Sequence, residues 1–212
     1  MELVQKAGVW PGRSAVTAGL KRVAPVVLGF VPVGFAYGVL ASKAGLSACN
    51  VVAMSVIVFA GSAQLASVAL FALGAPALAV VAATFVINLR HLLMSAALAP
   101  FLRSWPAWRV AAMTFQLTDE TFALHAVRFP RGNYPLGELF TINVTAQTAW
   151  VAGTVLGLAA SGMLADVRPL GLDFALPAMF AALLAFQLKD RVHVLVAVVS
   201  GAGSLLFLDL GA

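Results

Sequence analysis

Long apolar segments, separated by short stretches that contain charges, glycine or proline, make up most of the chain. Most segments reach the roughly 20 residues that an α-helix needs to cross about 30 Å of hydrocarbon. They predict an all-α fold, a polytopic transmembrane bundle of about seven helices. The predicted spans lie near residues 23–42, 48–72, 77–102, 110–127, 139–162, 174–188 and 192–208. The last two are short, so either could cross only part of the bilayer.

The predicted spans follow one another without a long polar linker, so residues 1–212 are expected to form a single integral membrane domain. Residues 1–22 precede the first span and are predicted to be a cytoplasmic, partly amphipathic lead-in. The span at 23–42 is longer than the apolar core of a cleavable signal peptide, which usually has about 7–15 residues. We therefore expect it to be a retained helix.

A short sequence motif occurs in two of the predicted helices. Ala63-Gln64 lies in the second helix and Ala146-Gln147 in the fifth, each the middle member of a group of three. Two successive groups of three helices have opposite orientations in the membrane. The repeated motif therefore indicates possible inverted three-helix repeats, a common design among transporters.

Composition excludes a water-soluble fold. Hydrophobic residues make up 62% of the chain and charged residues only 10%, against roughly 25% charged in a typical soluble domain. So few charges cannot cover a soluble surface, so the outer surface is expected to face the lipid bilayer. The net charge of +5 does not indicate nucleic-acid binding, because the cations are spread thinly between apolar segments.

The loop cations predict the orientation in the membrane, since cytoplasmic loops carry an excess of lysine and arginine. A cytoplasmic N-terminus places the larger set inside, namely Lys6, Arg13, Lys21, Arg22, Arg128, Arg131, Lys189 and Arg191. Only Lys43, Arg103, Arg109 and Arg168 then lie outside. We therefore expect the N-terminus to be cytoplasmic.

Charges near the centres of two predicted helices are the first sign of chemistry. Arg90 lies near the middle of the third helix, and Asp119 and Glu120 lie at the midpoint of the fourth. A charge at mid-membrane costs at least about 2.5–3.5 kcal/mol, so it needs a partner or a role. One guanidinium and two carboxylates at similar depth predict an ion pair with one carboxylate left over. Such a pair could also serve only to lock two helices together.

Polar residues also recur at helical spacing, so that each set shares one helix face. The sets are Gly61, Gln64 and Ser67; Thr84, Asn88, His91 and Ser95; and Asn143, Gln147, Trp150 and Thr154. Hydrogen bonds between helices would explain one such stripe, but three stripes and an ion pair predict the walls of a polar cavity. The candidate substrate-binding residues are Gln64, Asn88, Arg90, His91, Asn143 and Gln147, and the candidates for proton coupling or an ion pair are Asp119 and Glu120.

Smaller signals concern packing. Gly34-x-x-x-Gly38 and Gly153-x-x-x-Gly157 are typical of helices that pack closely. Pro25 and Pro32 predict a kink or a break in the first helix.

The sequence contains no motif for covalent chemistry or metal binding. H-E-x-x-H, a nucleophile elbow with a histidine partner and a Walker A loop are all absent. Cys49 is the single cysteine, and His91 has no second histidine at ligand spacing. His125 and His193 are predicted to be interfacial. We therefore expect no cofactor, no metal and no enzymatic activity.

The predicted cavity suits a small zwitterion with an aliphatic tail. Arg90 could bind a carboxylate through two parallel hydrogen bonds. Asp119 or Glu120 could bind an ammonium group or carry a coupling proton. A proton channel or a carrier of another zwitterion or cation could use the same groups. A non-transporting membrane scaffold or assembly subunit could hold them for packing alone.

Several motifs, in order and spacing, resemble the AzlC family, the large subunits of branched-chain amino acid exporters. They are Phe30–Gly38, Ala44–Ser47, Val58–Gln64, Asn88–Met94, Thr118-Asp119-Glu120 and Gly171–Pro177 with Phe180. The resemblance extends from about residue 12 to about residue 190, and its most specific parts are F-A-G-x-A-Q and N-L-R-H-x-L.

The resemblance implies efflux of the branched-chain amino acids valine, leucine and isoleucine, with methionine as a further candidate, across a bacterial inner membrane. It also implies a partner, a small AzlD-type membrane subunit. Exchange against protons is a plausible driving mechanism for such a carrier. Gln64, Asn88, Arg90 and Asp119 match the family motifs and are expected to line the path.

Overall fold

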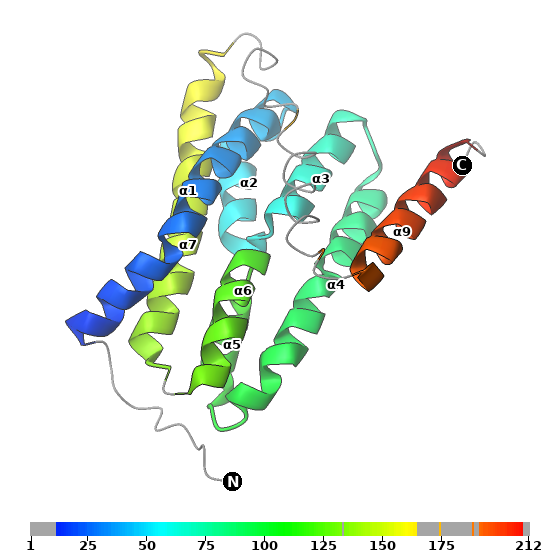
Figure 1. Ribbon diagram of the computed structural model, residues 1–212. Coiled ribbons are helices and arrows are strands. Elements are labelled where there is room, and N and C mark those ends of the chain that lie inside the picture. Colours follow the sequence, from blue (N-terminus) through cyan, green and yellow to red (C-terminus); the bar gives the residue numbers. More distant parts are fainter. Residues whose placement is uncertain (1–11, 133, 165–173, 175–187, 189–190, 210–212) are drawn as a thin grey trace. The chain divides into compact units, whose positions relative to one another are not determined.

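The computed structural model describes residues 12–132, 134–164, 174, 188 and 191–209 (Figure 1). The described residues form helices and include no strand, which confirms the all-α class. The chain divides into two compact units, Met1–Leu172 and Asp173–Ala212, and each is described by itself. In the second unit, α9 (Arg191–Asp209) matches the predicted span at 192–208. The predicted span at 174–188 lies outside the described residues except for its two end positions.

The first unit contains three helices with the length and apolar composition needed to cross a membrane. They are α1 (Arg13–Lys43), α4 (Ala77–Leu102) and α7 (Leu136–Ser161). The prediction for 77–102 is confirmed at both ends, because Pro76 lies just before the first helical residue. The helix predicted at 23–42 starts earlier, so the second half of the expected lead-in is helical. It also continues through Pro25 and Pro32, so no break occurs there.

The predicted helix at 48–72 is interrupted, which corrects the expectation of a continuous span. It consists of α2 (Ala48–Ala53), the π-helical segment η1 (Met54–Val58) and α3 (Gly61–Ala72). Phe59 adopts the left-handed conformation with φ 42° and ψ 47°, and Ala60 is non-helical with φ −137°. A side chain other than glycine in this conformation costs about 1–3 kcal/mol, so surrounding contacts must hold the break.

The predicted helix at 110–127 is interrupted as well. It consists of α5 (Ala107–Phe115) and α6 (Asp119–Arg128), followed by the 3₁₀ turn η2 (Phe129–Arg131). Thr118 is extended, with φ −120° and ψ 172°, and caps the start of α6. Both interruptions lie in the middle of a segment that hydropathy alone presents as one span.

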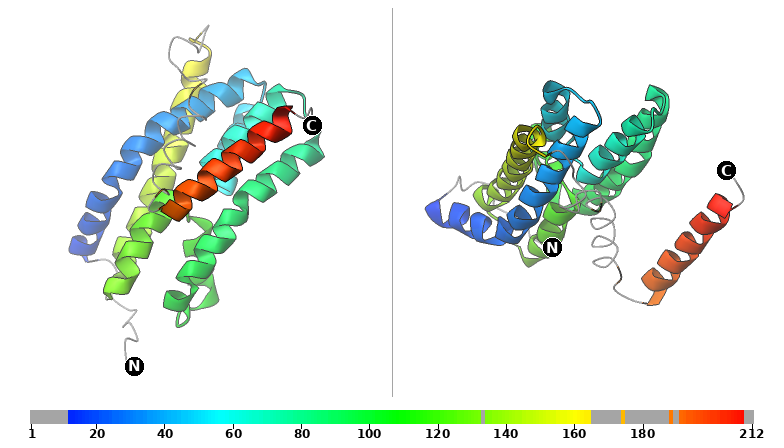
Figure 2. Two further views of the ribbon diagram at one scale, coloured as in Figure 1. Left: turned by 45° about the vertical axis from the view of Figure 1, so that its right-hand side comes forward. Right: turned by 90° about the horizontal axis from the view of Figure 1, so that it is seen from above.

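Close packing of α1 against α7 confirms the prediction from the paired glycines (Figures 1 and 2). A Cβ on Gly34 would lie 2.7 Å from the Trp150 carbonyl oxygen, and one on Gly153 would lie 2.5 Å from the Val31 carbonyl oxygen. The backbones of the two helices therefore touch where side chains would otherwise separate them.

The predicted repeat receives no support from the described residues. Gln64 lies in the first turn of α3, directly after a break, whereas Gln147 lies in the middle of the uninterrupted α7. The third helix of the second group would be the span at 174–188, which lies outside the described residues. The inverted repeat stays a prediction.

Candidate functional site

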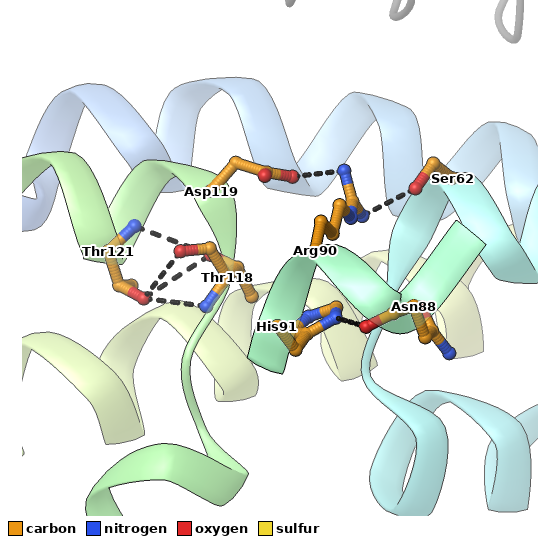
Figure 3. Close-up of polar contacts among 7 residues, drawn as sticks. All are labelled: Ser62, Asn88, Arg90, His91, Thr118, Asp119 and Thr121. Carbon is orange, nitrogen blue, oxygen red and sulfur yellow. Dashed lines mark hydrogen bonds and ion pairs between the residues drawn. The ribbon is translucent and has the colours of Figure 1, made fainter. Parts of the chain in front are cut away.

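Arg90, in the middle of α4, connects both helix interruptions. Its Nη1 forms an ion pair with the Asp119 carboxylate in the first turn of α6, and its Nη2 donates to Ser62 Oγ in the first turn of α3. Figure 3 shows the guanidinium reaching in both directions from α4. The arginine thus takes Asp119 as its partner, and Glu120 stays outside the pair.

Local helix chemistry places these partners. Thr118 Oγ1 accepts a hydrogen bond from Thr121 N at 3.3 Å, while Thr121 Oγ1 accepts one from Thr118 N at 2.9 Å, which together form a capping box. The cap fixes Asp119 as the first residue of α6, where the positive end of the helix dipole stabilises a carboxylate. At the other break, Ala60 provides no side-chain cap for α3. The first-turn N–H groups near Ser62 therefore have no side-chain acceptor at that cap.

The site retains unused hydrogen-bonding capacity. Arg90 Nε and Asn88 Oδ1 are buried and have no hydrogen-bond partner among the described residues. Leaving such a group unsatisfied costs about 1–3 kcal/mol. The charged pair is nevertheless accessible in part, since the Arg90 and Asp119 side chains are 26% and 23% exposed. His91, also half-buried, uses Nδ1 to contact the Asn88 carbonyl oxygen of its own helix at 3.3 Å.

A polar stripe on α7 forms hydrogen bonds with groups at both interruptions. Gln147 Nε2 donates to the Val56 carbonyl at 3.0 Å, and Gln147 Oε1 accepts from Gln116 Nε2 at 2.7 Å. Val56 belongs to η1, just before the first break, and Gln116 lies at the second. Asn143 Nδ2 donates to the Met113 carbonyl at 3.4 Å, close to the end of α5. One face of α7 thus binds backbone and side-chain groups that the interruptions leave available.

The same stripe continues into a fully buried network around Gln64. The Trp150 indole donates to Gln64 Oε1 at 3.1 Å, and Gln64 Nε2 donates to Ser55 Oγ at 3.1 Å. Ser55 and Thr154 are joined at 2.8 Å. Gly61 makes room for the indole, because a Cβ there would lie 2.7 Å from the ring. Gln64 therefore joins the two halves of an interrupted helix to α7.

The structure separates the predicted site residues into two groups. Arg90, Asp119 and the half-buried Asn88, His91, Glu120 and Gln147 lie around the interruptions. Gln64 and Asn143 have no exposed surface and bond to protein groups, so a ligand cannot reach them in this conformation. A pocket of about 660 Å³ lies at the α1–α2 end and includes Gly45, Asn50 and Phe71 in its lining, but none of the candidate site residues.

A second charged cluster, which the sequence did not reveal, lies at the start of α7. Glu138 is 4% exposed. Its carboxylate accepts hydrogen bonds from Arg22 Nε at 2.7 Å and from Arg128 Nε at 3.3 Å. It thereby joins α1, the end of α6 and α7. A signal was present, because an acid in a helix first turn beside loop arginines predicts a pair.

His125 connects this cluster to the α7 stripe. Its side chain has no exposed surface, and its predicted position at the membrane interface stays a prediction. Burial, and then the nearby Glu138 carboxylate, raise the pKa of the Tyr134 hydroxyl, so this group stays protonated and donates to His125 Nδ1 at 2.7 Å. His125 Nε2 then carries the proton and donates to Asn143 Oδ1 at 2.8 Å. The chain of hydrogen bonds ends at the interrupted helix through Asn143.

Replacement of Gln147 by alanine is expected to lower stability without changing helix content. It leaves the Val56 carbonyl and the Gln116 amide without their partner, at a cost of about 1–3 kcal/mol. The unfolding temperature of the purified protein in detergent measures this effect. Thr148→Ala is a matched control, since Thr148 is exposed and, among the described residues, its side chain bonds only to Val144 of its own helix. Equal unfolding temperatures for the two variants would contradict a supporting role for Gln147.

These features define a class: a polytopic helical membrane protein in which two interrupted helices meet at an interior ion pair. Interrupted helices at a central site are a recurrent feature of secondary carriers. The AzlC protein family matches residues 25–164, and the chain belongs to this family.

The relatives of this chain include membrane proteins of bacteria and archaea. The inner membrane protein YgaZ of Escherichia coli (strain K12) is 33% identical, over 93% of this chain and 84% of that protein. An uncharacterised membrane protein of Archaeoglobus fulgidus is 34% identical, over 89% of this chain and 83% of its own length. The branched-chain amino acid transport protein AzlC of Bacillus subtilis (strain 168) is 27% identical, over 89% and 73%. No solved structure gives a significant match.

Proposed function

We propose that this chain is a carrier subunit that exports valine, leucine and isoleucine, with methionine as a further candidate, by proton-coupled secondary transport. We further propose that it works with a small AzlD-type membrane subunit in a bacterial inner membrane, with its N-terminus in the cytoplasm. The substrate class is supported by the Bacillus subtilis relative, which is named a branched-chain amino acid transport protein. Proton coupling rests on the geometry of the interior ion pair, the partner on the family resemblance, the inner membrane on the name of the Escherichia coli relative, and the orientation on the loop cations.

The observation that carries the proposal is the position of Arg90 between two interrupted helices. A guanidinium binds a carboxylate through parallel hydrogen bonds, and an uncapped helix start adds N–H donors of the same sign. Arg90 lies beside such a start at Ser62. Asp119 adds the opposite charge, which an ammonium group requires. A neutral zwitterion with an apolar side chain therefore suits the site better than a simple ion does.

Efflux from cells tests the proposal. Cells that lack their own branched-chain exporters are loaded with dipeptides of leucine, isoleucine or valine, and efflux is followed with this chain alone and with its small partner. Faster efflux only with both chains supports a two-subunit exporter. If both proteins reach the membrane and efflux stays at background, the proposed substrates are wrong. The Asp119→Asn variant separates a carrier from a scaffold. If it lowers only the amount of assembled complex in the membrane, the result favours a scaffold.

A further inference from the structure

We propose that the head group of the amino acid inserts between Arg90 and Asp119, and that a proton competes with the substrate for Asp119. The inference rests on the proposed function and adds the mode of binding and the coupling step. In the structure, the Arg90 guanidinium and the Asp119 carboxylate neutralise one another in an ion pair that joins α4 to α6 (Figure 3). In the bound state, the substrate carboxylate pairs with Arg90 and the substrate ammonium pairs with Asp119.

Charge balance makes the insertion feasible in an apolar interior. The ion pair is neutral and so is the zwitterion, so binding adds no net charge to the site. Removing one partner from a buried pair, in contrast, leaves an uncompensated charge in the apolar interior, which is strongly unfavourable. A ligand with only one of the two charges must therefore leave either Arg90 or Asp119 unpaired. This difference selects for zwitterions over simple acids and amines.

The geometry supports a pair that opens. Both side chains are about a quarter exposed, so a ligand can reach them without unfolding a helix. Arg90 Nε and the side-chain oxygen Asn88 Oδ1 are buried without a partner among the described residues, and both become available to the ligand when the pair opens. Ser62, at the start of α3, holds the other arm of the guanidinium. The arginine therefore keeps its position when Asp119 turns away.

Asp119 has a defined electrostatic environment in the part of the chain that the structure describes. The charged or titratable groups that interact with it are Arg90 and His91 of α4 and Glu120 of its own helix. Glu120 lies next to Asp119 but does not contact the guanidinium. Asp119 is therefore the group that exchanges partners. The experiment must exclude Glu120 and His91 as the groups that bind the proton.

Proton competition turns this site into an exchanger. When Asp119 takes a proton, its carboxylate becomes a neutral acid, and the ammonium group loses its partner. The substrate then leaves with both of its charges, and the site carries one added proton. Loss of that proton on the opposite side restores the carboxylate and the Arg90–Asp119 pair. The O–H bond of the Asp119 carboxyl group is the one bond that forms and breaks, and one proton enters for each zwitterion that leaves.

Equilibrium binding as a function of pH tests the inference. The full chain, together with its small partner, is placed in lipid nanodiscs, and binding of labelled leucine and of isocaproate, its des-amino analogue, is measured. Competition by one proton predicts that leucine affinity falls by about tenfold per pH unit on the acid side. The affinity of the ionised form of isocaproate should show the opposite trend, because protonation of Asp119 frees Arg90 for the ligand carboxylate. Leucine binding that does not vary with pH, or parallel trends for the two ligands, would overturn the inference.

Three variants identify the group that carries the proton. Asp119→Asn should weaken leucine binding and remove its pH dependence. Glu120→Gln and His91→Gln should retain the acid-side loss of leucine affinity. If either of these flattens the pH profile while Asp119→Asn does not, the proton binds elsewhere and the inference is wrong. Because efflux is measured separately, this failure would leave the proposed function intact.

Discussion

Replacement of Arg90 by alanine is expected to abolish amino acid efflux and to lower the amount of folded protein. The change leaves the Asp119 carboxylate without its cation and Ser62 Oγ without its donor. Breaking a buried pair costs about 3–5 kcal/mol, and partial exposure of this pair places the expected cost toward the lower end. Efflux normalised to the amount of protein in the membrane measures the functional effect, and thermal unfolding in detergent measures the structural one.

Two further arginine variants separate charge from geometry. Arg103→Ala is the matched control, because Arg103 is an exposed cation at the end of the same helix, and it should retain efflux. Arg90→Lys keeps the charge but loses the planar fork, so it should restore abundance while efflux stays reduced by about tenfold or more. Full efflux by a normally expressed Arg90→Ala protein would show that Arg90 has no role in transport.

The second large effect is expected at the contact between α1 and α7. A Cβ added at Gly157 would overlap the carbonyl group of Phe35, a backbone atom that cannot move unless the helices separate. Overpacking a core costs about 1–3 kcal/mol, and a backbone clash exceeds that range. Gly157→Ala should therefore prevent stable insertion or lower the unfolding temperature strongly.

Gly29→Ala is the matched control for this variant. Gly29 lies in α1, but a Cβ there would meet nothing within 4 Å. Alanine is favoured over glycine inside a helix by about 0.5–1 kcal/mol, so the control should be as stable as the parent or slightly more stable. Size-exclusion profiles and unfolding temperatures of both variants test whether only the Gly157 substitution is destabilising. A stable Gly157→Ala protein would mean that α1 and α7 do not pack through this glycine.

Much of the helical architecture could be predicted because it depends on local composition. The apolar segment after Pro76, in which Arg90 is the one charge, is long enough for only one helix, and its bounds at 77–102 were confirmed. The small residues at Gly34, Gly38, Gly153 and Gly157 likewise predicted close packing, since only glycine lets two helix backbones touch. The presence of an interior ion pair also followed, because Arg90 needs a partner at its depth.

The interruptions required the tertiary structure, although one had a local signal. Thr118 followed by two acids is typical of a helix start, but continuous hydropathy across residues 110–127 concealed it. The break at Phe59 had no comparable signal, because its residues are as apolar as their neighbours. The α7 contact nearest to it, from Gln147 to the Val56 carbonyl, is a tertiary one.

The sequence by itself thus determined the class, the all-helical fold, the family resemblance and the residue types that carry the chemistry, since these follow from local composition and motif spacing. Only the tertiary structure decided the partners. It paired Arg90 with Asp119, assigned Gln64 and Asn143 to buried networks, and placed His125 inside the bundle. The physical reason is that helical spacing in the sequence shows which residues share a helix face. The breaks in the two interrupted helices then change the direction of that face and so determine which neighbouring residues it contacts.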